Sequence, residues 1–152
     1  MTPSLRGIHH VKLPVSDLLR SVDFYTAVFG AVRLTDADHV DGDGRLYAVI
    51  LRVPGLDPLV ELRLDAEQAR ASAGFDPLTL AVDDRAALAA WSAHLDARGV
   101  AHSPVIAAIR AWLVVFADPD GTRLRLYTLE QHGPEVAPAV DDPWLARPSA
   151  PR

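Results

Sequence analysis

His10 and Glu61 are the two side chains of this sequence whose types best suit chemistry. An imidazole titrates near neutral pH, and a carboxylate beside it orients the ring, so the pair could act in acid–base catalysis. The same two side chains could also bind a divalent metal. Cysteine is absent from the 152 residues, which excludes thiolate nucleophiles, disulfides and zinc–thiolate sites, so any metal must be held by histidine and carboxylate.

A strand and a helix must position His10. Residues 10–15 alternate, with Val11, Leu13 and Val15 on one face and His10 and Lys12 on the other, which predicts a strand with one buried face. Ser16 and Asp17 then fit an N-terminal cap, and residues 18–29 carry an apolar helical face that ends at Gly30.

Glu61 lies on a second predicted strand, residues 59–64, whose polar face also carries Arg63. Residues 31–34 and 46–53 are the other strands predicted in this half. The acidic stretch 35–44 is interpreted as a hairpin loop, because its aspartates lack the spacing of a calcium-binding EF-hand loop.

The same pattern begins again after residues 65–76, which we interpret as a linker. A strand at 78–82 leads through Asp83 and Asp84 into a helix at 85–98, and strands follow at 101–106, 111–117 and 122–129. A shift of 67 positions places Leu13 on Leu80 and Asp17 on Asp84. The chain is therefore predicted to be an α+β protein made of two βαβββ modules.

Strand parity predicts which side chains face away from the helices, where the two modules can enclose a cleft. This face is unusually charged. In addition to His10 and Glu61, it contributes the predicted ligand-binding residues Lys12, Arg63, Arg123, Arg125 and Tyr127. Tyr47 and Trp112 are also predicted to bind the ligand, because their aromatic rings could line the cleft and stack on a planar molecule.

These motifs together resemble the vicinal oxygen chelate superfamily, which includes glyoxalase I, bleomycin-resistance proteins, fosfomycin-resistance enzymes and extradiol dioxygenases. The resemblance is carried by the run at residues 10–18 with Ser21, Phe24 and Tyr25, by Val60, Glu61 and Leu62, and by the Asp-Pro-Asp-Gly turn at 118–121. It implies a curved mixed sheet around a cleft within one domain, residues 1–130, whose modules are 6–64 and 77–130. Residues 131–152 form a proline-rich tail.

The resemblance also implies a divalent metal held by the first and last strands of each module. The first module keeps both ligand positions, as His10 and Glu61, but the second has Pro77 and Arg125 there. Proline offers no ligand atom, and arginine is always charged and would repel a cation. We therefore expect no cofactor, and we expect Arg125 to pair with Glu61 or to bind an anionic group of a ligand.

The function predicted from the sequence is that of a glyoxalase/bleomycin-resistance-like protein that binds a small anionic or aromatic molecule without the family's metal. The alternative is an enzyme of the superfamily, a lyase, isomerase or dioxygenase. It would use His10 and Glu61 either as acid and base or as ligands of Zn, Ni, Mn or Fe. Bound metal, or activity lost on chelation, would separate the two.

Charge and hydropathy limit the partners. The formal net charge of −5 without a basic tract argues against nucleic acid, and no apolar run is long enough for a membrane span or a signal peptide. We expect a cytoplasmic homodimer. Trp144 and Leu145 are the large apolar residues of the tail, which is either an arm packed on a domain or a disordered segment.

Overall fold

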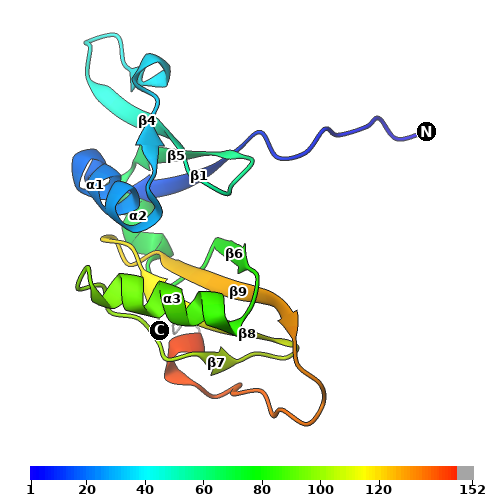
Figure 1. Ribbon diagram of the computed structural model, residues 1–152. Coiled ribbons are helices and arrows are strands. Elements are labelled where there is room, and N and C mark those ends of the chain that lie inside the picture. Colours follow the sequence, from blue (N-terminus) through cyan, green and yellow to red (C-terminus); the bar gives the residue numbers. More distant parts are fainter. Residues whose placement is uncertain (147–152) are drawn as a thin grey trace. The chain divides into compact units, whose positions relative to one another are not determined.

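The computed structural model describes residues 1–146 and divides into two compact units, the first of which ends at Ala69. Up to Ser72 the chain forms two helices, five strands and a short 3-10 helix at Thr35–Ala37. Figure 1 labels α1, α2, β1, β4 and β5 among them. The elements are β1 (His10–Val15), α1 (Leu18–Phe29), β2 (Val32–Arg33), β3 (His39–Val40), β4 (Leu46–Arg52), β5 (Leu59–Leu64) and α2 (Ala66–Ser72).

The second unit, from Arg70 onward, contains one helix and a four-stranded sheet. Its elements are β6 (Leu78–Val82), α3 (Arg85–Asp96), β7 (Ile106–Ala107), β8 (Ala111–Ala117), β9 (Arg123–Gln131) and a 3-10 helix at Pro143–Leu145. No helix within residues 1–146 combines the length and the apolar character that crossing a membrane requires.

The two sheets have the same topology, which confirms the predicted α+β fold with a repeated βαβββ pattern. Strand order is β1-β5-β4-β2 in the first sheet, with β3 paired to β4, and β6-β9-β8-β7 in the second. In each sheet the first and last strands of the module run parallel. Lys12 pairs with Glu61 in one sheet and Thr79 with Arg125 in the other, so the register makes Arg125 the counterpart of Glu61.

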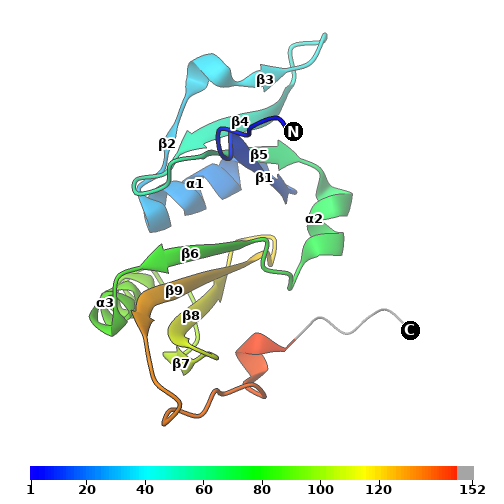
Figure 2. The same cartoon turned by 90° about the vertical axis from the view of Figure 1, so that its right-hand side faces the viewer.

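Side-chain caps start both long helices where the sequence predicts. Asp17 accepts a hydrogen bond from the Arg20 backbone N–H at 3.0 Å, and Asp84 accepts one from Ala87 at 2.8 Å. Gly30 ends α1 in the left-handed conformation, with φ of 65°. Each helix covers one face of its own sheet, as Figure 2 shows for α3.

Three segments differ from the prediction. The stretch 35–44, interpreted as a hairpin loop, contains the 3-10 helix at Thr35–Ala37 and β3, which pairs with β4. Residues 65–76, interpreted as a linker, contain α2, because Asp65 accepts a hydrogen bond from the Gln68 N–H at 2.9 Å and thereby caps a run of good helix formers. The strand predicted at 101–106 is reduced to β7 and a single bridge at His102. Pro104 has no N–H to donate there, and the Ser103 hydroxyl accepts from the Val115 N–H in place of a backbone carbonyl.

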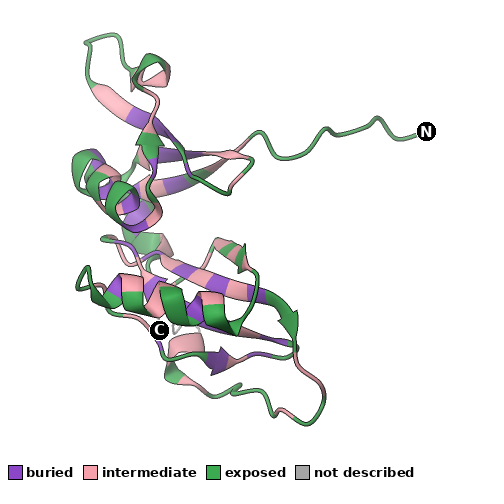
Figure 3. Ribbon diagram, viewed as in Figure 1, coloured by how far each residue is buried: buried purple, intermediate pink, exposed green. Residues whose placement is uncertain are grey.

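The tail covers the face of the second sheet that α3 leaves open. Along β9 buried residues alternate with partly exposed ones, which Figure 3 shows as alternating colours. On the open face, Trp144 and Leu145 pack against a cluster of buried residues: Ile106, Ala108, Leu113 and Val115. The tail up to Ala146 is therefore an arm packed on its own unit, and the rest of the predicted tail lies outside the described residues.

Candidate functional site

Glu61 is the centre of a charged cluster on the first sheet. The Glu61 side chain is only 2% exposed, and three basic side chains surround its carboxylate. The Arg63 Nε donates to Oε1 at 2.6 Å, while the His10 Nε2 and the Lys12 Nζ lie 3.3 and 3.9 Å from Oε2. The structure thus brings these four predicted residues together, and the carboxylate's negative charge is already neutralised by its neighbours.

His10 has both ring nitrogens engaged. Its Nε2 faces the Glu61 carboxylate, which can only accept, so the proton belongs on Nε2. Its Nδ1 then accepts from the Nδ1 of His9, 2.9 Å away. His9 is exposed beside His10. Both ring nitrogens of His10 therefore already face groups of the protein.

Tyr47 joins this cluster because of an irregularity in the sheet. The pairing of β3 with β4 shifts register between His39 and Val40, leaving Tyr47 as the extra residue on β4. Its ring lies under the Arg63 guanidinium, with the Cζ atom 5.3 Å from the ring centroid. Tyr47 therefore holds the cation that binds Glu61.

The residues present do not make up the metal-ligand set that the resemblance implies. A catalytic zinc needs about three protein ligands, and His10 and Glu61 supply two, of which Glu61 is bound by Arg63. The counterpart of Glu61 by register is Arg125, and the counterpart of His10 by the 67-residue repeat is Pro77. Within residues 1–146 no group of three or more histidine, aspartate and glutamate side chains is close enough to share an ion.

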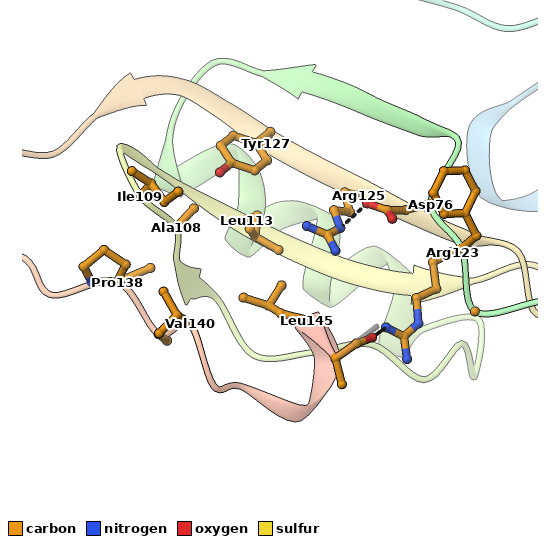
Figure 4. Close-up of a pocket in the computed structure, with 15 residues that line it drawn as sticks. Asp76, Ala108, Ile109, Leu113, Arg123, Arg125, Tyr127, Pro138, Val140 and Leu145 are labelled. Atoms are coloured by element: carbon orange, nitrogen blue, oxygen red, sulfur yellow. Dashed lines mark hydrogen bonds and ion pairs between the residues drawn. The ribbon is translucent and has the colours of Figure 1, made fainter. Parts of the chain in front are cut away.

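The second unit contains a pocket of about 840 Å³ between its sheet and the tail. This volume is within the range of small-molecule pockets, roughly 300–1,000 Å³. Three predicted ligand-binding residues of β9, Arg123, Arg125 and Tyr127, line it together with Leu113 of β8 (Figure 4). Strand parity predicted that these three side chains of β9 share one face of the sheet, and the structure confirms this. The other lining residues come from the segment before β6, the β7–β8 hairpin and the tail.

Within the second unit, Arg125 pairs with Asp76. Its Nε lies 2.6 Å from Asp76 Oδ2, in an ion pair whose angle is not that of a good hydrogen bond. Asp76 immediately precedes Pro77, so the acidic partner comes from the start of the same module. The charges are the opposite of those around Glu61. In the first sheet a carboxylate on the last strand is contacted by cations, whereas in the second sheet the cation Arg125 on the last strand is contacted by the carboxylate of Asp76.

Trp112, predicted to line the cleft, is not among the residues that line this pocket. The Arg85 guanidinium at the start of α3 lies over its ring, with Cζ 4.3 Å from the centroid, and the His132 ring contacts its edge. Its strand neighbour Leu113 points into the pocket instead. Aromatic character suggested a ligand contact for Trp112, whereas alternation along β8 assigns it to the opposite face.

His132 binds the beginning of the tail through contacts that depend on the protonation of its ring. Its Nδ1 lies 3.0 Å from the Gly133 carbonyl oxygen and its Nε2 2.9 Å from that of Ala108, so only the imidazolium donates to both. The hydrogen bond to Gly133, then that to Ala108 and the charge of Glu135, raise the pKa of His132 above 6.5 despite partial desolvation.

A raised pKa in the folded state means that this stabilisation is complete below about pH 6.5, the unfolded value, and is lost as the pH rises through the folded value. We expect the backbone amides of the tail to be less protected from hydrogen exchange at pH 8 than at pH 6, after correction for the pH dependence of intrinsic exchange. His132→Gln should remove that dependence, whereas His94→Gln, on α3, should leave it unchanged. An unchanged dependence in His132→Gln would contradict this assignment.

The fold and the family model agree on the class of this protein. The structure has the two βαβββ modules of equal topology that the resemblance to vicinal oxygen chelate proteins implies. The model of the Glyoxalase/Bleomycin resistance protein/Dioxygenase superfamily matches residues 7–126, and the chain belongs to this superfamily.

Solved structures with the same fold have varied functions. An antibiotic binding protein from Streptomyces sp. CB03234, TnmS3, is 25% identical over 84% of this chain and 98% of its own, with a TM-score of 0.64. A lactoylglutathione lyase from Agrobacterium tumefaciens is 18% identical over 84% and 96%, with a TM-score of 0.63. The fosfomycin resistance protein FosX of Listeria monocytogenes is 15% identical over 84% and 96%, with a TM-score of 0.62. No curated protein sequence matches.

Proposed function

We propose that this protein binds a small organic molecule, without a metal ion, in the pocket between the second sheet and the tail. The observation that carries the proposal is the position of Arg125. This residue is the counterpart of Glu61 in the second sheet, and it lines the pocket. A guanidinium there repels a divalent cation and attracts anions and aromatic rings. The resemblance to the antibiotic binding protein supports a binding role for the fold.

Elemental analysis of protein purified without an affinity tag tests the absence of metal, together with thermal melts in Zn²⁺, Ni²⁺, Mn²⁺ and Fe²⁺. We expect no near-stoichiometric metal and no specific rise in Tm, because only a ligand that binds the folded state stabilises it. Aromatic and anionic compounds are expected to raise Tm. Stoichiometric metal that disappears in His10→Ala or Glu61→Ala would overturn the metal-free proposal.

One observation favours the enzyme alternative. The His10 Nε2 lies 3.3 Å from Glu61, a histidine–carboxylate pair of the kind that serves in acid–base or metal-dependent lyases, isomerases and dioxygenases. Turnover of a superfamily substrate that is lost in His10→Gln while the fold persists would establish this function.

We also propose that the protein is a cytoplasmic homodimer. Sedimentation velocity at micromolar concentration tests the dimer.

A further inference from the structure

The pocket in the second unit is polar at one end and apolar at the other. Figure 4 shows Arg125, Asp76 and Arg123 together on one side, and the apolar side chains of the β7–β8 hairpin and the tail on the opposite side. Leu113 and Leu145 lie between the two ends. A ligand that fills this space must carry its polar group at one end of an apolar body.

The two arginines of the polar end have different tasks. The Arg123 Nη1 donates to the carbonyl oxygens of Trp144 at 3.1 Å and Ala146 at 2.8 Å, so this side chain holds the tail in place. Arg125 contacts Asp76 through Nε, and no partner within residues 1–146 engages either of its Nη atoms. The half of the guanidinium that suits a two-oxygen ligand is therefore the part left for a bound molecule.

The charges at this end select among ligands. Two guanidinium groups and one carboxylate leave a single positive charge unbalanced. A neutral ligand leaves that charge unpaired, and a second negative charge on the ligand meets the Asp76 carboxylate, 2.6 Å from Arg125. A carboxylate is planar and singly charged, and it matches two N–H donors of a guanidinium side by side.

We propose that the pocket takes a monocarboxylate with an aryl or alkyl body, whose carboxylate binds the Nη atoms of Arg125 and whose body lies against the apolar end. This inference rests on the proposed function, namely that the pocket binds a small organic molecule. It adds the ligand's chemical class, its charge and its orientation. Arg123 acts as a positioning residue because it fixes the tail wall.

The experiment compares three probes that share a phenyl body: 4-phenylbutyrate, its neutral amide, and the dianion 2-phenylsuccinate. Calorimetry with the full chain gives affinities, and shifts of the Leu113, Arg125 and Tyr127 amides in NMR spectra locate binding. We expect the monocarboxylate to bind roughly tenfold more tightly than the amide and the dianion, as a charge-assisted hydrogen-bond pair allows.

Two variants assign the preference to named groups. Arg125→Met is expected to make the monocarboxylate and the amide bind equally. Its control, Arg52→Met, removes the same charge from an exposed position on β4 and should retain the tenfold preference. Asp76→Asn, which keeps Arg125, is expected to bring the affinity for the dianion up to that for the monocarboxylate or beyond it.

The outcomes separate this inference from the proposed function. If the amide binds as tightly as the carboxylate and shifts the same pocket amides, the charge selection is wrong although small-molecule binding stands. If Arg52→Met abolishes the preference as Arg125→Met does, Arg125 is not the carboxylate's partner. If none of the probes, nor any other small aromatic or anionic compound, shifts the pocket amides, both the inference and the proposed function fail.

Discussion

Replacing Arg63 by methionine is expected to lower the free energy of unfolding of the first unit by about 2–3 kcal/mol. Removing one partner of a buried ion pair costs about 3–5 kcal/mol, because the other charge stays buried without compensation. Glu61 is 2% exposed, whereas Arg63 is 38% exposed and His10 and Lys12 still face the carboxylate, so we expect less than the full cost. Hydrogen exchange of the buried Val49 and Leu62 amides measures the change.

Arg52→Met is the matched control, because it removes the same charge from an exposed position of the neighbouring strand; we expect a change within about 0.5 kcal/mol. The double variant Arg63→Met with Glu61→Leu should recover most of the loss, since it leaves no carboxylate buried. Equal effects of Arg63→Met and Arg52→Met would mean that Glu61 does not depend on Arg63.

Trp144→Ala is expected to destabilise the second unit by about 2 kcal/mol, through lost apolar burial against Ile106, Leu113 and their neighbours. The Arg123 bonds to the Trp144 and Ala146 carbonyls should weaken as well, because they depend on the docked tail. Urea unfolding followed by the remaining tryptophans, Trp91 and Trp112, reports on this unit alone.

Val140→Ala serves as the comparison for Trp144→Ala. Val140 belongs to the same tail and lines the same pocket, but it is 69% exposed, so its truncation should change stability by less than about 0.5 kcal/mol. Similar midpoints for the two variants would show that the tail contributes no packing energy to the unit.

Features set by local patterns were predictable from the sequence. The bounds of α1, β5 and β8 match the predicted ranges, because capping residues, glycine stops and alternation act within a few residues. The equivalence of Glu61 and Arg125, which the register of the two sheets confirms, also followed from the internal repeat. A repeat aligns distant strands without any knowledge of their contacts.

Features that depend on distant contacts were not predictable. Nothing near Asp76 in the sequence indicates that it pairs with Arg125, since the two meet only when β6 lies beside β9. The aim of Tyr47 depends on a bulge, and the pocket wall depends on where an aperiodic tail docks. Only α2 left a usable signal, because Asp65 before a run of good helix formers is a typical helix start.

Because the tail forms one wall of the pocket, the proposed ligand recognition can change independently of the fold. The sheet supplies Arg125 and Tyr127, while Val140 and Leu145 of the opposite wall come from a segment that follows the last strand. Exchange of this terminal peptide would reshape the apolar end of the pocket without altering a strand. Under the proposed function, ligand preference could therefore diversify by changes in the segment after β9, while the duplicated scaffold stays constant.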